Sequence, residues 1–318
     1  MAVAETGVVH YPSRKVRTWF RGLSLVTALS VFALVVLGGV VRVTGSGLGC
    51  PDWPLCYGSV LPPLDAEAII EYTHRVVASA LVGPLVLATC GLAWIVFRSE
   101  RWLTIPATAA LLLLVAQAIL GGVTVVNELP GEIVLAHLAL GEALLGCMVL
   151  ISIVAYLGPP SLPAAGWAGS FPWLSLVAAG AVYVTLMSGS YVTNTGATGA
   201  CLDWPLCQGD VIPEHRLQMI HMAHRLVSGI VGLFLAFVLY TGIRQRNRPE
   251  SIRLVSKGIA ALFLAQVLIG AVIVWLKFPA DFRALHLGMA TAVWGAVVVL
   301  AALSFTAPRL PALEPADA

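Results

Sequence analysis

Eight long apolar stretches follow one another along the chain and are separated by shorter polar segments. They cover residues 20–42, 69–97, 103–126, 132–156, 171–193, 217–242, 254–277 and 283–306. About 20 apolar residues in a helix cross the hydrocarbon core of a bilayer. The stretches are continuous, whereas the strands of a membrane barrel alternate apolar and polar residues. The pattern therefore predicts an all-α polytopic membrane protein with eight transmembrane helices.

The second half of the chain repeats the first. Three pairs of segments match: CPDWPLCYGSVLP (50–62) with CLDWPLCQGDVIP (201–213), THRVVAS (73–79) with AHRLVSG (223–229), and QAILGGVTVV (117–126) with QVLIGAVIVW (266–275). Four helices per half is an even number, so both halves enter the membrane in the same direction. Repeats of this kind are related by an axis along the membrane normal. We therefore expect two pseudo-symmetric four-helix bundles.

The repeat and the apolar stretches divide the chain into five parts. These are a cytoplasmic N-terminal tail (1–19), an N-terminal four-helix half (20–157), a linker (158–170), a C-terminal four-helix half (171–306) and a cytoplasmic C-terminal tail (307–318). The linker is rich in Pro, Gly and Ala, which is typical of a connection between folded units. The first stretch is too long for the apolar region of a signal peptide and lacks a small-residue cleavage site, so it is expected to be retained.

Composition and charge support a membrane location. The chain is 59% hydrophobic and 11% charged, whereas soluble domains carry about 25% charged residues. A net charge of +2 gives no reason to expect a nucleic-acid partner. Most Lys and Arg residues lie on the side of the N-terminus, and such residues favour the cytoplasm. Both termini are therefore predicted to be cytoplasmic in the cell membrane, with both cysteine loops outside.

Four histidines occupy matching places in the two halves. His74, His137, His224 and His286 each lie about a turn into an even-numbered stretch, so they should share one depth near the outer surface. Polar side chains within membrane spans are costly and usually mark a site with a partner. A lone histidine in a span is often only a hydrogen-bonded packing residue. Two pairs in matching register favour a binding site.

Two facing histidines in a four-helix bundle suit a haem iron with two axial imidazoles. Zinc would need further ligands close by, and a proton relay would need Asp or Glu along the spans, where they are nearly absent. The sequence therefore predicts two haem sites, with His74 and His137 in one half and His224 and His286 in the other.

The halves differ three residues before the first histidine of each pair, where Glu71 is matched by His221. Residues three apart on a helix share a face, so Glu71 should point towards whatever His74 binds. A carboxylate near a helix N-terminus is also stabilised at a membrane boundary, because the helix dipole favours a negative charge there. The alternative is a catalytic group that moves protons at one haem site only.

Three arginines are candidates for contacts with haem propionates. Arg75 and Arg225 directly follow the histidines of the second and sixth stretches, and Arg42 ends the first. The competing interpretation for all three is that their charged ends extend to the membrane surface.

The outward position of the cysteine loops permits the disulfides Cys50–Cys56 and Cys201–Cys207. Closing so short a loop stabilises the fold by only about 2 kcal/mol in the chain-entropy model. Shaping a lid over the outer haem edge, with Trp53 or Trp204 as the wedge, is a better reason for the bridges. A redox role for Cys50–Cys56 is the alternative to simple stapling.

Several motifs together resemble the haem A synthase family over residues 20–306. They are VRVTGSGLGCPDWPLCYGSVLP, EYTHR, GGVTV and AHLALG in the first half, and HMAHR and ALHLG in the second. The resemblance implies oxidation of a ring methyl group of haem O to the formyl group of haem A, for cytochrome oxidase. It also implies a lipid-embedded enzyme supplied by a haem O-producing enzyme and served by a membrane electron donor.

The resemblance also implies roles for single residues. His224 and His286 match the ligands of a resident haem b, and His74 and His137 match the site of the substrate haem, with Glu71 as the catalytic carboxylate. The second cysteine pair is not found in every family member. For that reason we rank Glu71 above Cys50 and Cys56 as a catalytic group.

Two other functions compete with this interpretation. A non-catalytic di-haem cytochrome that passes electrons from quinol across the membrane would also need four histidines. It would favour haems at different depths and gives no reason for a carboxylate in one half only. A transporter with parallel repeats would be expected to contain broken helices or charged midplane residues.

Overall fold

The computed structural model of the protein describes residues 13–160, 170–245 and 248–306, and within these ranges it contains helices and no extended strands. Seven membrane spans are single helices: α1 (Arg14–Val43), α4 (Arg101–Val126), α5 (Gly131–Leu157), α6 (Ser170–Asn194), α7 (Arg216–Arg244), α8 (Glu250–Trp275) and α9 (Ala280–Phe305). The second span is built from α2 (Ala66–Val76), η2 (Val77–Val82) and α3 (Gly83–Val96). All eight spans are long and apolar enough to cross a bilayer. The predicted multi-pass membrane fold is confirmed.

The predicted tails and linker lie largely outside the described residues. Residues 1–12, 161–169 and 307–318 belong to this group. At the N-terminus, α1 already begins at Arg14, ahead of the apolar stretch, because the Ser13 hydroxyl accepts the N–H of Val16 and caps the helix. Six residues assigned to the N-terminal tail therefore belong to the first span.

The second span is interrupted, which the uninterrupted apolar stretch 69–97 did not predict. Residues Val77–Val82 form a wide π-helical turn that leads into α3, whose second residue is Pro84. Proline has no N–H, and its ring collides with the carbonyl of the preceding turn in a regular α-helix. A widened turn accommodates this ring. This turn begins three residues after His74, so it lies deeper in the span than that histidine.

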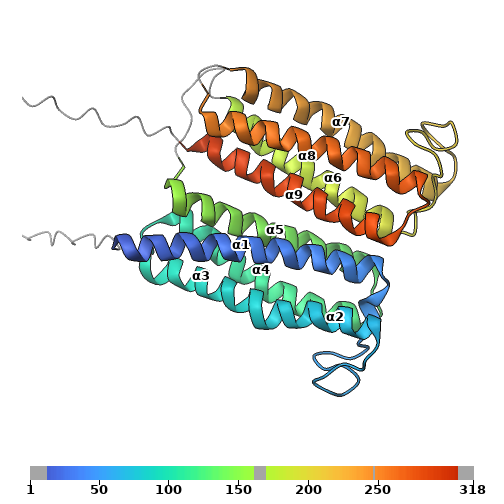
Figure 1. Cartoon of the computed structure of the whole chain (residues 1–318), viewed down its shortest axis with the longest axis horizontal. Helices are drawn as coiled ribbons and strands as arrows, with labels where there is room; N and C mark the ends of the chain where they lie inside the picture. Colours follow the sequence, from blue (N-terminus) through green and yellow to red (C-terminus); the bar gives the residue numbers. More distant parts are fainter. Residues whose placement is uncertain (1–12, 161–169, 246–247, 307–318) are drawn as a thin grey trace, which may run out of the picture.

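Each half of the chain forms a ring of four spans. In the first half, α1 packs against α2, α3 and α5, and α4 packs against α3 and α5. In the second half, α6 and α8 each pack against both α7 and α9. The helices that carry the histidines therefore occupy opposite corners of each ring, α2 facing α5 and α7 facing α9 (Figure 1).

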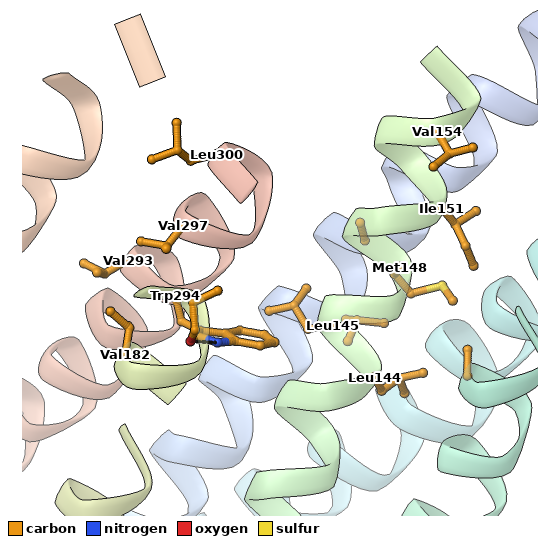
Figure 2. Close-up of a cluster of buried hydrophobic side chains, with 14 of the residues drawn as sticks. Leu144, Leu145, Met148, Ile151, Val154, Val182, Val293, Trp294, Val297 and Leu300 are labelled. Carbon is orange, nitrogen blue, oxygen red and sulfur yellow. Dashed lines mark hydrogen bonds between the residues drawn. The ribbon is translucent and has the colours of Figure 1, made fainter. Parts of the chain in front are cut away.

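The two rings meet through α1 and α5 on one side and α6 and α9 on the other. Figure 2 shows the Trp294 ring extending from α9 towards Leu145 on α5. A Cβ atom at Gly146 would lie 2.8 Å from that ring, so glycine is needed for this close approach. The Trp294 indole N–H donates to the Ala179 carbonyl at 3.1 Å. Close packing of this kind holds helices together in lipid, where burial of apolar surface gives little driving force.

Both cysteine loops extend from the same end of the molecule (Figure 1). The described chain ends, at the start of α1 and the end of α9, lie at the opposite end. Both cysteine loops therefore lie on the same side of the membrane.

Candidate functional site

The four histidines lie at matching depths. His74 and His224 are the ninth residues of α2 and α7, and His137 and His286 are the seventh residues of α5 and α9. His74 and His137 are close enough to interact electrostatically, and so are His224 and His286. The structure thus brings the predicted pairs together, one pair within each ring.

Each of these histidines packs against a glycine of the preceding span. A Cβ atom would lie 3.2 Å from the His74 Cε1 atom at Gly38 and 3.0 Å from that of His224 at Gly189. For His137 and His286 the glycines are Gly121 and Gly270, at 3.6 Å and 3.1 Å. At Gly38, Gly189 and Gly270 a larger side chain would crowd the imidazole, whereas at Gly121 a Cβ atom would make an ordinary contact. These glycines were not among the predicted site residues, and their recurrence in matching register is the signal in the sequence that identifies them.

Hydrogen bonds around the imidazoles differ between the two pairs. Ser188 Oγ lies 2.8 Å from Nδ1 of His224, whereas Nδ1 of His74, His137 and His286 is buried without a partner. Gln266 Nε2 lies 3.3 Å from Nε2 of His286. A hydroxyl that accepts the Nδ1 proton keeps the Nε2 lone pair of His224 available for a metal. Ser188 is a functional candidate that sequence reasoning did not find, because its match in the first half is Leu37.

This set of donors fits haem iron. Among residues 13–160, 170–245 and 248–306 no group of three or more His, Cys, Asp or Glu side chains could hold a metal ion. Two imidazoles per ring complete the coordination of an iron that a porphyrin already binds, whereas zinc needs about four protein ligands.

Glu71 is buried and holds the first cysteine loop. One carboxylate oxygen accepts the Cys50 N–H at 2.8 Å, and the other forms an ion pair with the Arg75 guanidinium. Arg75 in turn donates to the backbone carbonyls of Cys50, Asp52 and Leu55 at 2.7–2.8 Å. These contacts engage both terminal nitrogens of the guanidinium. Arg75 therefore fastens the loop, and its predicted contact with a propionate stays a prediction.

The second half repeats this arrangement without the carboxylate. Arg225 donates to the carbonyls of Asp203 and Leu206 at 2.7 and 2.8 Å, and its other terminal nitrogen lies 3.3 Å from Nε2 of His221. Arginine can only donate, so this His221 nitrogen must accept, and Nδ1 then donates to the Ala197 carbonyl at 3.1 Å. His221 is thus neutral, and the ion pair of the first half has no counterpart here.

The cysteine loops are closed by the disulfides Cys50–Cys56 and Cys201–Cys207, as predicted. In the first loop the Asp52 carboxylate accepts the N–H groups of Tyr57 at 2.6 Å and Gly58 at 2.7 Å. The Gly58 hydrogen bond, followed by that of Tyr57, holds the pKa of Asp52 below its ordinary value. This carboxylate stabilises the turn at the tip of the loop.

Arg42 connects the two rings at the end that carries the loops. Its terminal nitrogen donates to the Asn194 side chain of α6 at 3.0 Å, and its Nε is buried without a partner. The free Nε–H leaves Arg42 able to donate to a further acceptor, and the predicted propionate contact stays a prediction.

A second buried carboxyl group, Glu142 of α5, was not singled out from the sequence. It is fully buried between the rings, and the Thr291 hydroxyl of α9 donates to Oε1 at 2.6 Å. The other oxygen has no hydrogen-bond partner. A charge buried here with a single hydrogen-bond donor would be very costly, which favours the neutral form of the carboxyl group.

Comparisons with known proteins identify relatives over most of the chain. Residues 21–298 match the family described as "Cytochrome oxidase assembly protein". A protein of Alkalihalophilus pseudofirmus named "Heme A synthase" is 34% identical over 229 residues, which cover 70% of this chain and 77% of that protein. Proteins of the same name from Exiguobacterium sibiricum and Symbiobacterium thermophilum are each 30% identical, over 90% and 91% of this chain and 96% of their own length.

The matched range, residues 21–298, includes both histidine pairs and both cysteine loops, and the comparisons agree with the resemblance drawn from the motifs. The chain belongs to the family of cytochrome oxidase assembly proteins.

Proposed function

We propose that the protein is a haem A synthase that oxidises a ring methyl group of haem O to the formyl group of haem A. The observation that carries this proposal is an asymmetry between two otherwise similar sites. Both rings hold a facing histidine pair and an arginine-fastened loop, but only the first places a carboxylate, Glu71, one turn from its histidine. The names of the relatives support the same reaction.

The two sites take different roles in this proposal. His224 and His286 hold a resident haem b, which supplies one-electron redox chemistry when bound. The Ser188 hydroxyl supports this role because it fixes the orientation of His224. His74 and His137 receive the substrate haem O. The Nδ1 atoms of both lack a hydroxyl partner, as does that of His286, so the difference between the two sites rests on His224.

Glu71 acts as the proton acceptor at the substrate site. Oxidation of a methyl group breaks C–H bonds and releases protons, and a carboxylate at the edge of the site can take them up. The ion pair with Arg75 and the Cys50 N–H position this carboxylate. The competing role is purely structural, because the same contacts fasten the loop.

Arg42, with its free Nε–H, is the strongest of the three candidates for a propionate contact. The terminal nitrogens of Arg75 and Arg225 already donate hydrogen bonds, mostly to backbone carbonyls of the cysteine loops.

The topology follows from the positive charges near the N-terminus. The chain lies in the cell membrane with both termini in the cytoplasm and both cysteine loops outside. Its partners are a haem O-producing enzyme and a membrane electron donor.

Replacement of Glu71 by Gln tests the role of the carboxylate. Gln keeps the shape but cannot accept a proton at neutral pH. We expect Glu71→Gln protein to keep haem b and to bind haem O, while haem A forms about 10²–10⁴-fold more slowly. The measurement is acid extraction of the purified protein followed by chromatography of haems b, O and A.

A matched control separates chemistry from loop structure. Asp52→Asn weakens the same loop and leaves Glu71 intact, so it should form haem A at a rate close to that of the unmodified protein. Equal loss of haem A in both variants would show that Glu71 acts only through the loop. Unmodified protein that contains haem b alone, with no haem O or A when haem O is supplied, would instead favour the di-haem cytochrome.

A further inference from the structure

An apolar groove of about 380 Å³ lies between the first cysteine loop and α4. Its walls are formed by Trp53, Ala118, Ile119, Gly122, Val123 and Val126, with Asn127 at its end. The Trp53 ring lies directly on Gly122, where a Cβ atom would come within 3.1 Å of it. Ile119 and Val126 are largely exposed towards the lipid. The groove therefore opens to the hydrocarbon of the bilayer on one side and is bounded by the loop on the other.

The groove adjoins the substrate site of the proposed function. Gly121 and Gly122 are neighbours on α4, and the first faces the His137 ring while the second faces Trp53. Consecutive residues of a helix point about 100° apart, so the His137 ring and the groove lie against neighbouring faces of α4 at the same depth. A ligand at His137 would reach the groove around this side of α4, where neither Gly121 nor Gly122 carries a side chain.

The matching place in the second half carries a larger side chain. In the repeat, Val126 corresponds to Trp275 and Gly122 to Ala271. The Trp275 ring packs edge to face against Trp204, the counterpart of Trp53, with their centroids 6.0 Å apart. A tryptophan thus occupies the second half at the position where the first half carries a valine and a groove.

Haem O differs from protohaem by a long isoprenoid chain on one edge of the porphyrin. Building on the proposed function, we propose that the groove receives this chain, and that Trp275 denies it the matching place in the second half. Moving an apolar chain from lipid into an apolar groove gains little, because lipid is equally apolar. Selection therefore works by shape: the first half admits a haem with a chain, and the second half excludes it.

Val126→Trp tests this assignment because it places in the first half the tryptophan that the second half carries at the matching position, Trp275. Purified protein is incubated with haem O or with protohaem, and the bound haems are extracted and separated. We expect haem O bound at the first half to fall about tenfold or more, as overpacking of a close-fitting site does. Protohaem binding should not change. Val115→Trp is the control, since Val115 is a lipid-exposed residue of α4 outside the groove.

The reciprocal variant is Trp275→Val, which should allow haem O to replace part of the resident haem in the second half. Unchanged haem O binding by Val126→Trp would overturn the proposal and leave the groove to lipid chains. Equal loss of haem O and protohaem would overturn it as well, because the effect would then not depend on the isoprenoid chain. Both results concern binding alone. Formation of haem A by the unmodified protein tests the proposed function separately.

Discussion

A hydroxyl group separates the surroundings of His224 from those of His74. Ser188 contacts the His224 ring, and Leu37 holds the matching position of the repeat in the first half. Partners of this kind fix the tautomer and the ring orientation of a metal ligand, and they often affect affinity as much as the choice of ligand does. Such support at His224 suits a permanently bound haem, whereas a substrate haem must be released.

We expect Ser188→Ala to weaken retention of the resident haem about 10–100-fold. The measurement is the rate at which the low-spin b-type absorption is lost to apomyoglobin. Ser228→Ala is the matched control, because the Ser228 hydroxyl donates to the His224 backbone carbonyl at 2.7 Å and does not contact the ring. His224→Ala should remove the signal entirely. Equal haem loss from the Ser188 and Ser228 variants would exclude a specific role for Ser188.

At the scale of secondary-structure elements, the first cysteine loop is stabilised by an ionised carboxylate. Asp52 accepts two backbone N–H groups of the loop tip, which lower its pKa. A group whose pKa is lower in the folded state contributes stability above its ordinary pKa, which is about 4 for Asp. That contribution is lost as the pH falls through the lower, folded value. Acid should therefore loosen this loop below about pH 4.

This pH dependence can be followed through the disulfide that closes the loop. A phosphine reduces both disulfides in the same sample, and the two rates are compared. The ratio of the Cys50–Cys56 rate to the Cys201–Cys207 rate should rise as the pH falls below about 4. Asp52→Asn should give faster reduction at neutral pH and remove the difference in pH dependence. If the two disulfides respond identically to acid in the unmodified protein, the carboxylate does not control the loop.

The spans were predictable from the sequence, whereas the contacts around the site largely were not. The length of an apolar stretch is set by the bilayer, so the limits of α5 and α9 fall within a few residues of the prediction. The π-helical turn before Pro84 was missed because the apolar stretch continues through it unchanged. The contacts Gly38–His74, Ser188–His224 and Glu142–Thr291 join residues distant in the chain. Such pairs appear only when the order of the helices around each ring is known.

At the scale of the whole molecule, the two rings are joined by hydrogen bonds as well as by apolar packing. Glu142 accepts from Thr291, and the Tyr183 hydroxyl of α6 donates to the Ala139 carbonyl of α5 at 2.7 Å. Both hydrogen bonds cross between the halves within the membrane span. They fix the position of one ring relative to the other, and therefore the separation of the two histidine pairs.

Glu142→Ala should lower the stability of the folded protein by about 1–3 kcal/mol, because the buried Thr291 hydroxyl loses its acceptor. Glu142→Gln keeps a neutral acceptor of the same shape and should be close to the unmodified protein, as expected if the carboxyl group is protonated. Thermal unfolding in detergent gives the comparison. A Gln variant as unstable as the Ala variant would show that Glu142 is ionised and paired in another way.

Glu142 and Thr291 occupy the same position of the internal repeat. In a symmetric dimer a residue at the two-fold axis meets its own copy, so both partners must be identical and self-compatible. Two glutamates would compete for one shared proton, and two threonines would leave a shorter contact. Joining the two halves in one chain removes this constraint, because each copy can then mutate alone. The Glu142–Thr291 pair is a contact that a homodimeric ancestor could not have formed, and the same freedom permits one half to become a site of reaction while the other retains a cofactor.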